Sequence, residues 1–202
     1  MSQLINQLAR LGAILVLLVY SMGTHAATID KKRASDLKAA FLAQLTGYTD
    51  WPNSAESTAP ITIGVFGSDP NSVIGLIRKG MAAPGGLAPQ GRRLQLMDLN
   101  TSAEVLDLAE QLRECEVLFL SEDAFVHWPA LKPMVEAQPI LTVGESDGFA
   151  EHGGVVEFYP DPDVDRLVMR INLRALRRSG VVLSATILSL SNVVILNAEA
   201  EE

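Results

Sequence analysis

The chain has 202 residues, of which 24 are acidic and 16 are lysine or arginine, so its formal net charge is -8. This charge repels the phosphates of nucleic acids and anionic lipid headgroups, which excludes nucleic acid as a partner. The length suits one domain with its own hydrophobic core, and a low aromatic content of 5% is typical of an α/β core.

The first 26 residues predict a secretory signal peptide. Only Arg10 and the amino terminus carry charge before an apolar run over residues 11–20, and small residues follow it. The run is about half as long as a bilayer requires, so a permanent membrane span is the weaker interpretation. We place the cut after Ala26, the domain over 27–197 and an acidic tail over 198–202. Export to the periplasm excludes functions that need ATP, NAD or DNA, and we expect no cofactor.

The first half of the domain predicts alternating helices and strands. Residues 29–48 carry an apolar stripe at helical spacing with charged residues between, the stripe being Leu37, Phe41, Leu45 and Tyr48. Trp51 and Pro52 end that helix. Residues 60–66 read as a strand, and Asn71 or Ser72 can cap a helix that runs to about residue 79.

The middle of the chain continues this alternation. After a glycine-rich loop over 80–91 we expect a strand over 92–98, a helix over 103–113 and a short helix near 131–136. The strands over 117–120 and 139–143 are apolar throughout, which indicates a parallel sheet covered by helices on both faces.

The last third changes the pattern. Strands over 154–159 and 166–172 are separated by a gap too short for a crossover helix, so they should pair as an antiparallel hairpin. A short basic helix over 173–178 ends at Gly180, and a last helix is expected over 184–196. The predicted fold is therefore an α/β single-domain sandwich with a mixed, mostly parallel sheet, flanking helices and a C-terminal antiparallel hairpin.

Ser146 is the one candidate nucleophile in a known motif. Residues 144–148 fit the pattern G-x-S-x-G and follow a strand, which raises the hypothesis of an esterase. That pattern needs a helix directly after the serine, and here a Gly-Gly pair leads into another strand. The only downstream histidine, His152, lies on the same loop. We therefore favour a plain turn and no enzyme.

The sequence gives only weak evidence for a metal site or for a functional cysteine. His127 and His152 lack the spacing of a metal pair, and the alternate carboxylates over 161–165 lack the glycine and glutamate of a calcium loop. Cys115 is the only cysteine, so no intramolecular disulfide can form. A small buried side chain is the favoured interpretation of Cys115, and an interchain bridge or a reactive nucleophile are the alternatives.

A basic cluster stands out in this acidic chain. It comprises Arg170, Arg174, Arg177 and Arg178, and the last three share one face of the short helix. A solvated face that neutralises nearby carboxylates is the simpler interpretation. A docking patch for an acidic partner or an anionic ligand is the alternative.

Seven segments in fixed order resemble the YfiR-like family of exported bacterial proteins. The resemblance runs from Lys38 to about Val194, and its marks lie at 38–52, 61–67, 115–120, 139–143, 148–154, 170–173 and 183–190. It implies an α/β sandwich that forms a homodimer in the periplasm and regulates by contact. Its partners would be the periplasmic domain of an inner-membrane diguanylate cyclase, which it represses, and an outer-membrane lipoprotein antagonist. Lower cyclic di-GMP would then disfavour biofilm formation.

The resemblance places the partner-binding surface in the C-terminal third. The candidate residues there are Phe149, Phe158, Arg170, Asn172, Arg174 and Arg177. Cys115 matches one position of a family disulfide, whereas the strand position of its partner is Gly64 here. A different class of function, a periplasmic small-ligand-binding module of another sensor system, would hold its ligand in a crevice at the strand ends.

Overall fold

A computed structural model of the protein describes residues 30–52, 58–86, 89–99, 105–161 and 166–196. The predicted signal peptide with its cut after Ala26, and the predicted acidic tail, lie outside the described residues. Within the described ranges, no helix combines the length and the apolar character needed to cross a membrane.

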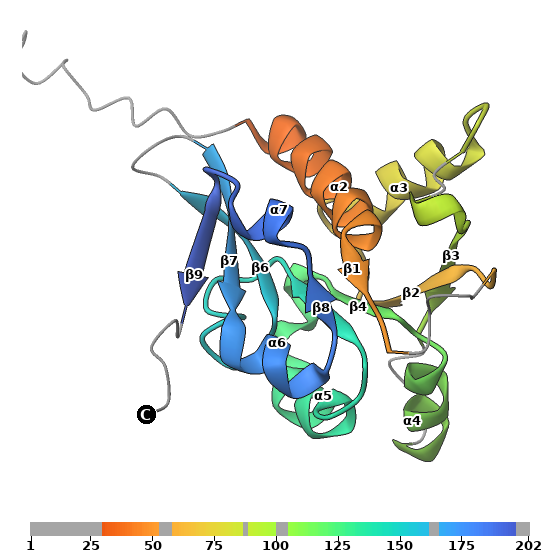
Figure 1. Ribbon diagram of the computed structural model, residues 1–202, viewed down its shortest axis with the longest axis vertical. Helices are drawn as coiled ribbons and strands as arrows, with labels where there is room; N and C mark the ends of the chain where they lie inside the picture. Colours follow the sequence, from red (N-terminus) through yellow and green to blue (C-terminus); the bar gives the residue numbers. More distant parts are fainter. Residues whose placement is uncertain (1–29, 53–57, 87–88, 100–104, 162–165, 197–202) are drawn as a thin grey trace, which may run out of the picture.

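Helices and strands alternate along most of the chain (Figure 1). The helices are α2 (Lys31–Gly47), α3 (Val73–Ala82), α4 (Val105–Arg113), α5 (Trp128–Val135), α6 (Leu173–Ser179) and α7 (Ala185–Leu188), with 3-10 turns η1 (Pro89–Gly91) and η2 (Glu122–His127). The strands are β1 (Thr49–Asp50), β2 (Ile61–Phe66), β3 (Leu94–Asp98), β4 (Val117–Leu120), β5 (Leu141–Gly144), β6 (Val156–Asp161), β7 (Arg166–Asn172), β8 (Val182–Leu183) and β9 (Val193–Leu196).

Seven strands form one mixed sheet in the order β3, β2, β4, β5, β6, β7, β9. Strands β3 to β6 of this order run parallel, β7 is antiparallel to β6, and β9 is parallel to β7. The predicted hairpin is confirmed, with Val156 opposite Ile171 and Asp161 opposite Arg166. The predicted α/β fold class is therefore confirmed.

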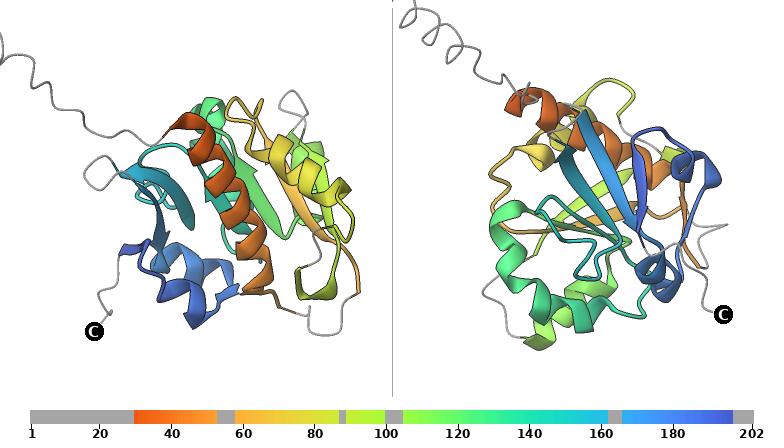
Figure 2. Two further views of the ribbon diagram at one scale, coloured as in Figure 1. Left: turned by 90° about the horizontal axis from the view of Figure 1, so that it is seen from above. Right: turned by 90° about the vertical axis from the view of Figure 1, so that its left-hand side faces the viewer.

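Helices cover both faces of the parallel half of the sheet. Every residue of β2, β4 and β5 is buried, as the unbroken apolar runs predict. One core cluster joins the sheet to α2 and α3, and a second joins its other face to α4 and α5. Figure 1 shows α2 and α3 above the sheet and α4 and α5 below it, and the left view of Figure 2 shows α2 (orange) lying over the sheet.

The predicted last helix over 184–196 is wrong beyond its first turn. Ser184 does cap a helix, since its hydroxyl accepts a hydrogen bond from the Thr186 amide at 3.2 Å, but α7 ends at Leu188. The chain then turns and adds β9 to the sheet edge beside β7. The β-branched run Val193–Ile195 favours a strand. A helix was predicted because the spacing of the apolar residues in this segment also suits a helix.

Two smaller predictions about helices are also corrected. The buried face of α2 carries Lys38, Leu42 and Leu45, whereas the predicted stripe member Tyr48 is 40% exposed. At the start of α3, neither Asn71 nor Ser72 caps with its side chain. The Asp69 carboxylate accepts the hydrogen bond from the Gly75 amide instead, at 3.0 Å.

Cys115 is a small buried side chain, which confirms the favoured interpretation. It is 5% exposed, and burial, followed by the nearby charges of Glu116 and Glu114, raises the pKa of its thiol to about 11. The structure also brings Cys115 against Gly64, since a Cβ added at Gly64 would lie 2.6 Å from the Cys115 Sγ. The two positions that the family resemblance pairs are thus in contact.

Candidate functional site

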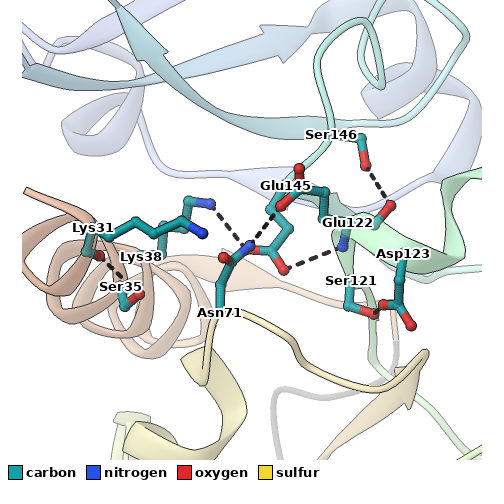
Figure 3. A network of polar contacts seen from close by, with 9 residues as sticks. All are labelled: Lys31, Ser35, Lys38, Asn71, Ser121, Glu122, Asp123, Glu145 and Ser146. Carbon is teal, nitrogen blue, oxygen red and sulfur yellow. Dashed lines mark hydrogen bonds and ion pairs between the residues drawn. The ribbon is translucent and has the colours of Figure 1, made fainter. Parts of the chain in front are cut away.

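The carboxyl ends of β2, β4 and β5 meet at one edge of the sheet, where folds of this class usually bind ligands. Figure 3 shows the polar side chains at this edge, with Lys38 extending from α2 toward Glu145 and the loop after β4 beside them. Ser146, the candidate nucleophile, lies at the same edge.

Lys38 and Glu145 form a buried ion pair at this edge. Their Nζ and Oε2 atoms are 2.9 Å apart, and the two side chains are 9% and 0% exposed. The other carboxylate oxygen of Glu145 accepts a hydrogen bond from the Glu122 amide at 3.2 Å. The sequence pattern puts Lys38 among the charged residues that lie between the apolar positions of this helix. The missed signal is its spacing, four residues before Leu42 and seven before Leu45, on the buried face of α2.

Ser146 has a structural partner at the same edge. Its hydroxyl donates to the Glu122 carbonyl at 3.3 Å, and the residue is 8% exposed. The chain continues in a turn, as predicted, and no helix follows to aim the hydroxyl. Among the described residues no hydrogen bond joins Ser146 to His152, whose Nδ1 lies 2.7 Å from the Gly148 carbonyl.

The loops that follow β2 and β4 are also hydrogen-bonded to each other. The Ser68 amide donates to Asp123 Oδ2 at 3.1 Å, and the Ser121 hydroxyl donates to the other oxygen of the same carboxylate. The Ser121 hydrogen bond, supported by Ser68, holds the pKa of Asp123 below its ordinary value. In the part of the chain that the structure describes, no group of three or more His, Cys, Asp or Glu side chains is arranged to hold a metal ion.

The C-terminal hairpin carries a second charged network, centred on Arg170. Its Nη1 lies 3.0 Å from Asp147 Oδ1 and 3.1 Å from Glu157 Oε1. Its guanidinium carbon lies 3.4 Å from the centroid of the Tyr159 ring, which is a cation-π contact. The Arg170 side chain is 20% exposed, so part of it still reaches solvent.

The pKa directions in this network follow from burial and charge. Burial raises the pKa of the Glu157 carboxyl, against the lowering effects of the Ala150 amide and of Arg170. Burial opposes the charge on Arg170, yet Glu157, Tyr159 and Asp147 together raise its pKa. Because the Glu157 side chain is fully buried, its ion pair with Arg170 holds the Arg170 side chain in place.

Three of the six predicted partner-binding residues lie inside the molecule. Phe149 and Phe158 are 0% exposed, with the Phe149 ring 4.7 Å from that of Trp128. Asn172 is 4% exposed and caps α6, its side-chain oxygen accepting from the Ala175 amide at 2.9 Å. These three side chains therefore support the fold and present no surface to a partner in this structure.

The other three predicted residues reach solvent. Arg174 and Arg177 are exposed on α6, which follows directly after β7, the strand that carries the partly exposed Arg170. Arg178 is engaged with Glu136 at 3.1 Å. We call Arg170, Arg174 and Arg177 the arginine surface.

Comparison with protein families gives one match across most of the chain. The model of the family described as YfiR/HmsC-like matches residues 35–192, which include both charged networks and the arginine surface. No curated protein matches this chain.

Comparison with solved structures supports the fold. The chain is similar to the ABC domain from Streptococcus pneumonia, crystallised in complex with L-Trp, with a TM-score of 0.52 at 10% sequence identity. The similarity covers 80% of this chain, which spans only 60% of that protein. At this identity the likeness concerns the arrangement of strands and helices alone.

Proposed function

This chain belongs to the YfiR/HmsC-like family, and from that premise we propose that it represses an inner-membrane diguanylate cyclase by protein contact in the periplasm. The observation that carries the proposal is the family match over residues 35–192. The internal bonding of Ser146 and of the strand-end loops supports a regulatory role over a catalytic one.

The arginine surface is our candidate for the cyclase contact. Arg174 and Arg177 are exposed cations on a chain of net charge -8, and Arg170 on the preceding strand is held in place by Glu157. Such a patch fits an acidic surface on the periplasmic domain of the cyclase. Docking there lowers cyclic di-GMP synthesis if the inactive arrangement of the cyclase binds this protein more tightly than the active one.

The proposal includes two further partners that the family resemblance implies. A second copy of this chain would make a homodimer, and an outer-membrane lipoprotein would titrate the protein away from the cyclase. Biofilm formation would rise when the lipoprotein engages it. Sedimentation equilibrium of the purified protein tests the homodimer, and a monomer at micromolar concentration would remove it from the proposal.

The test of the main proposal uses the cyclase itself. Deleting the gene should raise cellular cyclic di-GMP and surface attachment, and the purified protein should retain the periplasmic domain of an inner-membrane cyclase. The double variant Arg174→Glu with Arg177→Glu should weaken that binding by at least about tenfold, because like charges then face each other. Arg93→Glu is the matched control, since Arg93 is an exposed arginine outside the arginine surface. Unchanged cyclic di-GMP in the deletion strain contradicts the proposal.

A further inference from the structure

A cavity of about 450 Å³ lies between α5, α6 and the loop over 151–155. It is within the size range of small-molecule sites, roughly 300 to 1,000 Å³. It opens beside the beginnings of β5 and β6, where Ile140 and Val155 contribute to its wall. The crevice expected from the sequence was at the opposite, carboxyl ends of the strands.

Part of the cavity wall is apolar and firmly held. Trp128, Val135, Ile140 and Val155 line it, and each is 2% to 4% exposed. The Trp128 ring packs 4.7 Å from Phe149, and its Nε1 donates to the His152 carbonyl at 3.2 Å. The cavity therefore offers a pre-formed apolar floor to the hydrophobic part of a ligand.

Two helices supply cations to the rim of this floor. Lys132 comes from α5 and Arg174 from α6, and among the described residues neither side chain has an ion-pair or hydrogen-bond partner. The Lys132 ammonium lies against the loop, since a Cβ added at Gly153 would be 2.7 Å from its Nζ. Lys132 is half-buried, and a partly desolvated ammonium favours an anion beside it.

The remaining charges at the rim are Arg178, Glu136 and Glu151. Arg178 and Glu136 neutralise each other through an ion pair of 3.1 Å. Glu151 is exposed on the loop. Lys132 and Arg174 are thus the two cations of this cavity that no described carboxylate neutralises.

The buried polar groups of the wall are already satisfied. Asn172 donates to the Ala150 carbonyl at 2.7 Å and accepts from the Ala175 amide. The Thr142 hydroxyl accepts from the Val155 amide at 2.9 Å. A neutral hydrogen-bonding ligand would find little to bind here, whereas an anion would find two free cations.

We propose that this cavity binds a small organic anion. Its apolar body lies on the floor that contains Trp128, and its single carboxylate or phosphate group lies between Lys132 and Arg174. This inference goes beyond the proposed function, because binding of such a ligand requires no cyclase.

The test is isothermal titration calorimetry of the purified protein with three probes of similar size. Benzoate and phenyl phosphate carry the two candidate anionic groups, and benzyl alcohol is the neutral comparison. We expect saturable binding of at least one anion and none of the alcohol, with a change in tryptophan fluorescence on binding. The tighter anion identifies the head group. Equal binding of benzyl alcohol, or no binding of either anion at millimolar concentration, overturns the proposal.

Variants locate the binding to this cavity. Arg174→Gln and Lys132→Gln should each weaken binding of the preferred anion about tenfold or more, because each removes a charged hydrogen bond. Arg177→Gln is the matched control on the same helix, since Arg177 does not line the cavity. Lys132→Arg keeps the charge and should retain binding. Unchanged affinity of both glutamine variants for the anion overturns the proposal. Binding of the cyclase by Arg177 variants is measured separately, because it tests the proposed function and not this cavity.

Discussion

The carboxyl edge of the parallel strands and the C-terminal region around α6 both carry charged side chains, but they use them differently. At the strand edge, Lys38, Glu145 and Asp123 bond within the molecule. Around α6, Lys132, Arg174 and Arg177 have no ion-pair partner among the described residues. The charged side chains at the strand edge are thus held by internal bonds, whereas these three cations around α6 are left for recognition of a partner or ligand.

Among the substitutions that test this comparison, removal of the Glu145 carboxylate should have the largest effect on the free energy of unfolding. Glu145→Ala leaves the Lys38 ammonium buried without a partner, and we expect a loss of about 3 to 5 kcal/mol in the free energy of unfolding. Urea denaturation followed by tryptophan fluorescence measures it. The double variant Lys38→Met with Glu145→Leu removes both charges and should recover most of the loss. A loss under about 1 kcal/mol in the single variant would mean that the pair is not buried as described.

Adding a disulfide to the parallel half should have the next largest effect. Gly64→Cys places a second thiol against Cys115 and would close a loop of about 50 residues, for which loop entropy predicts stabilisation of up to about 4 kcal/mol. Leu99 must shift slightly, because its Cδ1 lies 3.0 Å from the added Cβ. Thermal unfolding with and without reductant measures the gain. Failure of the two thiols to oxidise would contradict the contact between these positions.

Removing Arg170 tests the second buried carboxylate. Arg170→Met deprives Glu157 of its cation, and we expect a loss of about 2 kcal/mol at pH 7. The pKa of Glu157 is already raised by burial, so its contribution to stability is present below its ordinary pKa and is lost as the pH rises through its folded value. Loss of Arg170 raises that pKa further. The loss in free energy of unfolding of the variant should therefore become smaller as the pH falls from 7 to 5. A loss that does not depend on pH would argue against the unpaired charge of Glu157 as its cause.

The cation-π contact should have the smallest effect. Tyr159→Leu removes the ring that lies 3.4 Å from the Arg170 guanidinium, and we expect a loss of about 0.5 to 1 kcal/mol. Tyr159→Phe keeps the ring and is the matched control, with little change expected. Equal losses in the two variants would assign the effect to the hydroxyl group instead.

Local patterns in the sequence predicted much of the fold. The unbroken apolar runs in β2, β4 and β5 indicated strands covered on both faces, and the short gap before β7 indicated a hairpin. The helix α6 ends at Gly180, whose φ of 73° lies in the left-handed region that glycine adopts without strain. These features depend on neighbours along the chain, which a sequence displays directly.

The candidate site was predicted only in part, because burial depends on distant residues. Arg174 and Arg177 are exposed as a basic helix face suggests, whereas Phe149 and Phe158 are buried by packing from other elements. Lys132 was not singled out, since its importance comes from the cavity between α5 and α6. A single lysine on a short helix gives no sign of that cavity.

The sequence by itself determined the strand runs, the hairpin, the caps at Ser184 and Gly180 and the family resemblance, because each depends on residue types at short or ordered spacing. Tertiary structure alone decided that Val193–Leu196 joins the sheet, that Lys38 meets Glu145 across 107 positions, and that Lys132 and Arg174 share one cavity. Each of these features results from contacts between residues far apart in the chain. A local sequence pattern carries no information about the free energies of such contacts.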